Sequence, residues 1–481
     1  MKWHYIINII GILLIVLALS MFFPIGCSLF YDDGSIIPLL YSTLITIGVG
    51  STLFLISRGT EIDYINQREG MAIVALGWTI ISLFGALPFY LGDVCNFSDA
   101  FFESVSGFTT TGSSILTNIE SVSKSLLFWR SFIQWLGGMG IIVLSLAILP
   151  FLGVGGMQLF KAEVPSPVPD KLTPRLTDSA KILWYVYILF SIAQVILLLF
   201  GGMNLYDSLC HTFTTMPTGG FSTKNSSIAH FNSSYIDYVI LIFMVLAGIN
   251  FSLHYQLLRG KTLIFWRDSE CRFFLLFILG VTLAVTFNVY GTVYDSFEKS
   301  FQYASFQVVS IITTTGYATA DYELWPGLSQ VLIFICLFIG ASAGSTGGGM
   351  KFARIMVCFK YCYREIFSLI HPSSVSQIKM NSVVVQNHVV RSIMGFIALY
   401  IGLFVFCSIL LSVMGLDLVT SFSAVATCIG NVGPGFGAVG PIDNFASIPV
   451  AGKWLLSWCM LIGRLEIYTM IILFVPEFWK K

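Results

Sequence analysis

The sequence predicts an all-α integral membrane protein, with four membrane-pore-membrane repeats arranged as one pseudo-fourfold pore and two transmembrane helices before them. Of the 481 residues, 56% are hydrophobic and only 10% are charged, whereas about a quarter of the residues in soluble domains are charged. A glycine-centred loop also recurs four times between apolar segments, at intervals of roughly 100 residues. We therefore expect about ten spanning helices and four half-helices that stop inside the membrane.

The recurring loop has the same centre in each copy. Residues 108–113 read FTTTGS, 217–222 read PTGGFS, 312–317 read ITTTGY and 430–435 read GNVGPG. The equivalent glycines are Gly112, Gly220, Gly316 and Gly433, and a hydroxyl residue lies six positions before each: Ser106, Thr214, Ser310 and Thr427. Threonine runs followed by glycine are poor helix formers. Because non-helical backbone at membrane depth is tolerated only inside protein or beside a water-filled cavity, the four loops predict a pore.

Every repeat is expected to follow the order helix, half-helix, loop, helix. The N-terminal region, residues 1–70, supplies the two preceding helices at 5–24 and 37–57. The repeats are expected at 71–160, 161–270, 271–384 and 385–481. Half-helices are expected to begin at Asp99, which we interpret as an N-cap, at Asp207, near Ser300 and near Thr420. The second spans of repeats one and four are expected to be continuous over 126–152 and 450–476.

Repeat three differs, because residues 340–350 (GASAGSTGGGM) interrupt its second span. Glycine at this density does not sustain a regular helix. Close helix packing through small residues is one interpretation. We favour a flexible break beneath the loops that opens and closes the pore. The predicted gating residues are Gly344, Ser345, Thr346, Gly347, Gly348 and Gly349.

Arg464 lies well inside the last predicted span. An arginine at this depth is costly unless it faces water or a partner. An internal salt bridge with Glu466 is the alternative, but residues two apart do not face each other on a helix. We expect Arg464 to face the pore below the loops, where its charge would repel cations while the gate is shut.

The positions of lysine and arginine predict the orientation. Most of the 25 lie on the side that contains both termini, which predicts that both termini are cytoplasmic. Cys27 and Cys95 both fall on the outer side and could pair, which spacing alone does not decide. His211, on the second half-helix, is interpreted as a hydrogen-bonded packing residue rather than a proton relay. The net charge of zero gives no indication of a nucleic-acid partner.

The loops favour a cation as the permeating species. Each half-helix is expected to enter from the outer side and end at the pore centre, so the negative end of its dipole points at a loop. The loops carry neither Lys nor Arg, and they lack a ring of carboxylates of the kind that a calcium pore would use. Backbone and threonine oxygens suit a weakly hydrated monovalent ion, and potassium (K+) is the first candidate. The predicted ligands are Thr110, Thr111, Gly112, Thr218, Gly219, Gly220, Thr314, Thr315, Gly316, Asn431, Val432 and Gly433.

Two other classes of function fit the sequence less well. A secondary transporter of another small solute would favour two inverted repeats and charged residues at the membrane centre, whereas the sequence has four parallel repeats and one arginine there. An intramembrane enzyme would need clustered His, Asp, Glu or Ser side chains, and the six histidines are dispersed. The sequence leaves open whether transport is channel-like or coupled to protons, and whether sodium is also carried.

The motifs together resemble the TrkH/TrkG branch of the Trk/Ktr/HKT superfamily of potassium-translocating subunits. They are SGFTTTGSS at 106–114, PTGGFST at 217–223, SIITTTGYATADY at 310–322, GASAGSTGGGMK at 340–351, GNVGPGFG at 430–437 and GRLEIYT at 463–469. The resemblance implies a K+-channel-like pore in the bacterial cytoplasmic (inner) membrane, with residues 344–349 as the gating loop and Arg464 facing the pore. It also implies glycine at the first filter position for potassium preference, where serine accompanies sodium.

The resemblance further implies a homodimer that sits in the lipid bilayer on a ring of cytosolic TrkA-type subunits that bind nucleotides. The chain itself has no Walker A motif and no G-x-G-x-x-G fingerprint on a βαβ unit. Any nucleotide site is therefore expected on the partner, and no organic cofactor is expected here. Met216-Pro217 and Asn431 depart from the threonine-rich pattern of the other loops.

Overall fold

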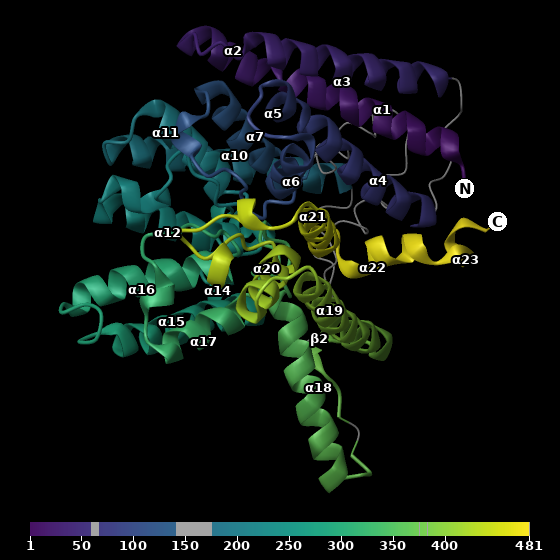
Figure 1. The fold of residues 1–481 in the computed structure, drawn as a ribbon. Helices are drawn as coiled ribbons and strands as arrows, with labels where there is room; N and C mark the ends of the chain where they lie inside the picture. Colours follow the sequence, from purple (N-terminus) through teal and green to yellow (C-terminus); the bar gives the residue numbers. More distant parts are fainter. Residues whose placement is uncertain (59–66, 141–175, 375, 382, 481) are drawn as a thin grey trace.

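The computed structural model describes residues 1–58, 67–140, 176–374, 376–381 and 383–480 of the chain. Helices make up almost all of its regular structure (Figure 1). A short antiparallel pair, β1 (Lys379–Met380) and β2 (Val383–Val384), follows one of the helices. This architecture confirms the prediction of an all-α protein.

Two N-terminal helical segments lie side by side along one flank of the molecule (Figure 1). The first consists of α1 (Trp3–Ser20) and α2 (Phe22–Tyr31), and the second is α3 (Ile36–Ile56). Gly11 and Gly50 allow their backbones to meet, since a Cβ atom added at Gly11 would lie 2.9 Å from the carbonyl oxygen of Gly50. Small residues permit such close approach where water does not drive helices together.

The rest of the chain repeats three helical elements four times. The first helices are α4 (Gln67–Gly85), extended by α5 (Leu87–Leu91), then α10 (Leu176–Phe200), α15 (Ser269–Val289) and α19 (Asn387–Val413). The half-helices are α6 (Phe97–Phe108), α11 (Leu205–Thr215), α16 (Phe297–Ile312) and α20 (Leu418–Gly430). The second helices are α7 (Lys124–Gly138), α12 (Ser234–Gly248), α17 (Gly327–Cys336) and α21 (Val450–Arg464).

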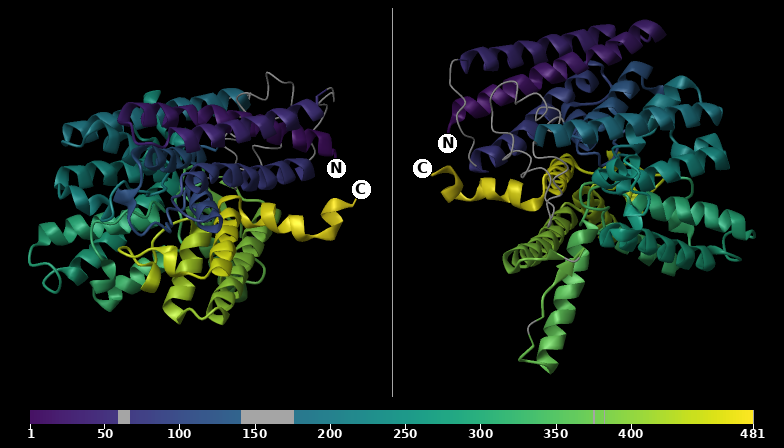
Figure 2. Two further views of the ribbon diagram at one scale, coloured as in Figure 1. Left: turned by 45° about the horizontal axis from the view of Figure 1, so that its top comes forward. Right: turned by 180° about the vertical axis from the view of Figure 1, so that it is seen from behind.

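Shorter elements connect these helices. They are α13 (Phe251–Leu258), α14 (Ile264–Arg267), α18 (Phe352–Ile370), α22 (Ile467–Ile471), α23 (Pro476–Trp479) and the 3₁₀ turns η1 (Ile119–Ser121), η3 (Ser227–Phe231), η4 (Tyr322–Leu324), η5 (Gly437–Val439), η6 (Phe445–Ser447) and η7 (Ile472–Phe474). Helix α18 projects away from the body in Figures 1 and 2.

Within the described residues, six helices are long and apolar enough to cross a membrane, or seven if the bent pair of α12 and α13 counts as one span. All four first helices and both N-terminal segments belong to the six. The chain is therefore a multi-pass membrane protein. The second helices of the repeats are shorter: α12 bends into α13, α17 ends at Cys336, α21 ends at Arg464 and α7 ends at Gly138.

The half-helices begin earlier than the sequence suggested. Asn96, not Asp99, is the N-cap of α6: its side chain accepts a hydrogen bond from the backbone N–H of Asp99 (3.0 Å) and donates to the Asp99 carboxylate (2.9 Å). Asn204 and Asp207 make the same reciprocal pair at the start of α11. The prediction that Asp99 is the cap was therefore wrong, because the aspartate occupies the third helical position of a capping box.

The second helices end close to the four loops. α12 turns by 102° into α13, α17 stops at Cys336, and α21 stops at Arg464. The continuous helix predicted over 450–476 was wrong, since Glu466 takes a φ of +61° between α21 and α22. α7 ends at Gly138. Most of the remainder of the span predicted at 126–152, and the repeat boundary at 160, lie outside the described residues.

The repeats pack in a cycle. The second helix of one repeat lies against the half-helix of the next in the pairs α7–α11 and α12–α16, and α21 of repeat four returns to α6 of repeat one. Lys453 on α21 and Asp99 on α6 form an ion pair of 2.7 Å at this closure. Two large apolar clusters flank the cycle, one from α1 with repeats one and four, the other from repeats two and three.

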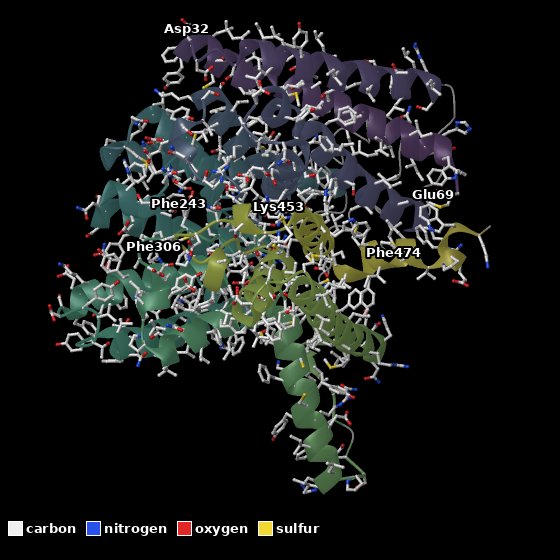
Figure 3. The ribbon with its side chains drawn as sticks, in the orientation of Figure 1. Asp32, Glu69, Phe243, Phe306, Lys453 and Phe474 are labelled. Carbon is white, nitrogen blue, oxygen red and sulfur yellow. The ribbon has the colours of Figure 1, made fainter. Side chains whose placement is uncertain are left out.

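Both chain termini lie at the same end of the molecule (Figure 1). Glu69, at the start of α4, lies near this end, whereas Asp32 lies at the opposite end, beyond α2 (Figure 3). The helices of the body therefore run between these two ends.

Candidate functional site

The four loops have one backbone conformation. The residue two positions before each equivalent glycine has a positive φ: +52° at Thr110, +59° at Thr218, +61° at Thr314 and +52° at Asn431. The glycines themselves have φ values of +84°, +70°, +82° and +102°. A β-branched residue in this region is strained, and such strain persists only where the surroundings impose it.

The same backbone hydrogen bond ends all four half-helices. The N–H before each glycine donates to the carbonyl five residues earlier: Thr111 to Ser106 (2.9 Å), Gly219 to Thr214 (2.8 Å), Thr315 to Ser310 (2.8 Å) and Val432 to Thr427 (2.9 Å). These acceptors are the hydroxyl residues that marked the repeat in the sequence. Their carbonyl groups bind the loops, and such bonds satisfy the free carbonyls at a helix C-terminus.

The four glycines form a closed cycle of contacts with the neighbouring loops. A Cβ atom added at Gly112 would lie 2.2 Å from the carbonyl oxygen of Gly219. The corresponding distances are 1.9 Å from Gly220 to Thr315, 2.1 Å from Gly316 to Val432, and 2.9 Å from Gly433 to Thr111. Each glycine thus faces the carbonyl of the residue before the next glycine, in the order one, two, three, four, one. The ring contains eight of the twelve predicted ligand residues, and the other four, Thr110, Thr218, Thr314 and Asn431, directly precede them in the four loops.

Side chains also join adjacent loops. Asn431 Nδ2 donates to Thr111 Oγ1 (2.9 Å), and Ser113 Oγ donates to the carbonyl of Gly433 (3.3 Å). The hydroxyl of Tyr317 donates to the carbonyl of His211 (3.0 Å). In loop two, the Gly219 carbonyl also accepts a bond from Gln134 Nε2 on α7 (2.8 Å).

A row of buried polar side chains packs against the loops, and of its members only His211 received an interpretation from the sequence. Nine positions before the first three glycines stand Glu103, His211 and Gln307. Glu103 accepts from the N–H of Ile115 (3.0 Å), His211 Nε2 lies 3.0 Å from Ser222 Oγ, and Gln307 Nε2 donates to the carbonyl of Ala320 (3.0 Å). Their shared offset from the glycines is the signal that could have found them. His211 is thus a hydrogen-bonded packing residue.

Glu103 also forms a buried ion pair with Arg130 of α7. The two side chains are 1% and 2% exposed, and Arg130 Nε lies 2.6 Å from Glu103 Oε1. Arg130 Nη1 donates to the carbonyl of Ser222 (2.9 Å), and its guanidinium lies 3.6 Å from the centre of the Phe221 ring. The pair therefore ties the segment after loop one to the segment after loop two.

Acidic residues lie where loops three and four continue outward. Glu323 Oε1 accepts a bond from the N–H of Gly437 (2.6 Å), which links repeat three to repeat four. Burial raises the pKa of Glu323 above its ordinary value, and the negative charges of Asp321 and Asp443 add to this increase. The N–H of Gly437 acts in the opposite direction.

The predicted gating loop, residues 340–350, packs against the ends of three half-helices. Gly348 N donates to Thr314 Oγ1 (2.7 Å) after α16, and Thr346 Oγ1 donates to the carbonyl of Met216 (2.9 Å) after α11. A Cβ atom added at Gly348 would lie 2.5 Å from the carbonyl oxygen of Gly430, the last residue of α20. The segment thus contacts repeats two, three and four.

Arg464 joins this segment to the end of α7. Its guanidinium donates to the carbonyls of Thr346 (2.8 Å), Gly137 (2.9 Å) and Gly138 (3.0 Å). A cation is favourable at a helix C-terminus, where free carbonyls carry partial negative charge. Arg464 also lines a cavity of about 130 Å³, together with Gly344, Gly348 and other residues of the segment. Glu466 forms an ion pair with Arg354 on α18.

Cys27 and Cys95 do not form a disulfide in the structure, since both thiols are free. Among the described residues, no group of three or more His, Cys, Asp or Glu side chains is placed to hold a metal ion.

Known proteins resemble the chain over its whole length. Residues 42–481 match the family model TrkH, described as a cation transport protein. The Trk system potassium uptake protein TrkH of Escherichia coli (strain K12) is 40% identical over 489 residues, and that of Halomonas elongata is 39% identical over 485 residues, each with both chains fully covered. The crystal structure of the potassium transporter TrkH from Vibrio parahaemolyticus covers all of both chains with a TM-score of 0.90 at 36% identity. The chain belongs to the TrkH family of cation transport proteins.

Proposed function

We propose that this protein is the pore-forming subunit of a potassium uptake system. The observation that carries the proposal is the closed cycle in which each loop glycine faces a carbonyl of the next loop. Such a ring of backbone oxygens can replace the water around a monovalent cation. Full-length relatives are named potassium uptake proteins, which favours potassium as the transported ion.

The electrostatics of the ring support a cation. The four half-helices end at the loops, so the negative ends of four helix dipoles converge there. The side chains of the predicted ligands are neutral. The ion would therefore meet partial negative charge without a fixed carboxylate, which allows it to bind and to leave.

Residues 344–349 and Arg464 form the proposed gate. Support comes from their position against the ends of three half-helices and from the bonds of Arg464 to Thr346, Gly137 and Gly138. In this arrangement a fixed positive charge lies on the side of the ring where the half-helices end. A cation leaving the ring would meet both the loop and that charge.

The proposed setting is the bacterial cytoplasmic (inner) membrane, with both termini in the cytoplasm. The shared position of the termini (Figure 1) and the excess of Lys and Arg on that side support it. We further propose a homodimer regulated by cytosolic TrkA-type nucleotide-binding subunits, as the motif resemblance implies. The Trk system name of the relatives supports only a system of several components. The proposed repeat boundaries are those of the sequence analysis.

Ion flux through the purified protein tests the proposal. Rubidium and sodium uptake would be measured in liposomes, with and without a pH gradient, against protein-free liposomes. We expect rubidium uptake that potassium inhibits more strongly than sodium does. Uptake that requires the pH gradient would assign the protein to proton-coupled transport, and the absence of rubidium uptake in both conditions would refute the proposal.

A further inference from the structure

We infer that Glu270 is a positioning residue that fastens the gating loop at both of its ends, an inference that rests on the proposed gate. Glu270 lies in the first turn of α15 and is 8% exposed. Its Oε1 atom accepts hydrogen bonds from the backbone N–H groups of Ala343 (2.7 Å) and Ala353 (3.0 Å). Ala343 directly precedes Gly344, and Ala353 lies in the first turn of α18, after the loop. One oxygen therefore holds both ends.

The chemistry of this contact favours a strong attachment. Ala343 and Ala353 are buried, at 3% and 1% exposure, so their N–H groups need a partner inside the protein. Both N–H groups donate to the same Glu270 oxygen, so removing that oxygen leaves two buried donors without this partner. The carboxylate also lies at the N-terminus of α18, where the helix dipole favours negative charge.

Helix α15 provides a fixed base for the attachment. Phe352, the first residue of α18, packs among three aromatic rings of α15, at centroid distances of 5.7 Å from Phe273, 5.3 Å from Phe274 and 5.4 Å from Phe277. These apolar contacts hold the beginning of α18. Glu270 also attaches the other end of the loop to α15, because the backbone N–H groups of Ala343 and Ala353 donate to the same Glu270 oxygen.

The remaining bonds at the base of the loop do not replace this contact. Gly340 N donates to the carbonyl of Met350 (2.9 Å). This bond joins the two ends of the loop to each other but does not attach them to α15. Phe251 N donates to the carbonyl of Gly344 (3.0 Å), which attaches the loop to the bend between α12 and α13. Glu270 thus couples the loop to its own repeat, and a displacement of α18 acts on the oxygen that positions Ala343.

The test compares Glu270→Ala, Glu270→Gln and the control Glu298→Gln, which changes an exposed carboxylate on α16 of the same repeat. Rubidium uptake into liposomes without the cytosolic partner would be measured together with hydrogen exchange of the segment 340–353. We expect Glu270→Ala, which removes both hydrogen bonds, to raise the unstimulated flux by at least about tenfold, the ratio that corresponds to the loss of a single hydrogen bond. Glu270→Gln, which keeps an oxygen at the same place, should give intermediate flux and exchange.

The two readouts separate the inference from the proposed function. Exchange in Glu270→Ala that equals the wild-type rate at Ala343 and Ala353 would overturn the inference, whatever the flux. Faster exchange with unchanged flux would support the attachment and count against the loop as a gate. If Glu270→Ala does not fold, wild-type exchange and flux in Glu270→Gln would overturn the inference, since a neutral amide makes weaker bonds than a carboxylate.

Discussion

Asn431 in loop four donates a hydrogen bond of 2.9 Å to Thr111 in loop one, and this contact joins the last repeat to the first. The same Nδ2 atom donates to the carbonyl of Met460 on α21 (3.0 Å). Asparagine also tolerates the positive φ of +52° at this position better than most residues do. One side chain therefore connects both loops with the second helix of repeat four.

Replacing Asn431 by alanine should loosen this closure. Asn431→Ala removes two hydrogen bonds, of which the one to Thr111 joins the two loops. We expect it to lower the preference for potassium over sodium by at least about fivefold, the ratio that corresponds to the loss of one neutral hydrogen bond. The measurement is competition of sodium with rubidium uptake in liposomes. Asn225→Ala, which removes hydrogen bonds on the exposed outer surface, should leave the preference unchanged, and equal effects of the two variants would contradict the role of Asn431.

Serine at the ring glycines should disturb the neighbouring carbonyl. In Gly112→Ser and Gly316→Ser, the new Cβ atoms would lie 2.2 Å and 2.1 Å from carbonyl oxygens of the next loop, so these oxygens must move. We expect both variants to lose most of their discrimination between potassium and sodium. The matched control is Gly202→Ser, which has a similar φ of +88° but no atom within 4 Å of an added Cβ. Unchanged ion competition in both ring variants would argue against the ligand assignment.

Breaking the buried pair of Glu103 and Arg130 should destabilise the fold. Arg130→Leu would leave the Glu103 charge uncompensated, which costs about 3–5 kcal/mol of unfolding free energy. Arg364→Leu breaks an exposed pair with Glu365 and should cost less than about 1 kcal/mol. Thermal unfolding in detergent, followed for both variants, checks the difference. A loss for Arg130→Leu as small as that for Arg364→Leu would show that the pair is not a structural support.

Arg464→Ala should raise the unstimulated flux, because it removes three hydrogen bonds to backbone carbonyls and a positive charge near the ring. Shortening residues 344–349 should have the same direction of effect. Rubidium uptake at equal protein content in liposomes is the measurement, with Arg364→Ala as an exposed control. Lower or unchanged uptake in both altered proteins, with normal expression, would refute the gate.

Acidification of the outer side should reduce flux through protonation of Glu323. An ordinary glutamate has a pKa of about 4.3. Because the pKa of Glu323 is raised, we expect the loss of flux to occur at a higher pH than that. The sign for stability is opposite to that of a paired carboxylate: the contribution of Glu323 to folding is largest at low pH and is lost as pH rises through its folded pKa. Glu323→Gln should remove this part of the pH dependence of rubidium uptake. An identical pH profile in the variant would assign the effect to another group.

The sequence predicted the repeated elements well because their signals are local. The equivalence of Gly112, Gly220, Gly316 and Gly433 followed from motif spacing, and the structure places all four in one ring. The interruption at 340–350 followed from glycine density alone. The family resemblance and the all-α membrane fold are both confirmed by the comparisons.

The features that the sequence analysis missed depend on tertiary contacts. The break of α21 at Arg464 has no glycine run or proline to mark it, and it follows from the bonds of Arg464 to repeats one and three. The capping role of Asn96 was hidden by Asp99, which is an equally good cap in isolation. The paired carboxylate of Glu103 could not be distinguished from a surface residue, since its partner lies 27 positions away on α7.

The ring of loops belongs to a single polypeptide, and this has a consequence for how such a protein can change. In a tetramer of identical subunits, every codon change alters all four quarters at once. Here one codon changes one quarter. Asn431 can therefore close the ring, Glu103 can carry a charge and the proposed gate can be a single segment, each without three copies elsewhere. Single substitutions can therefore change the ion preference of this chain in small steps.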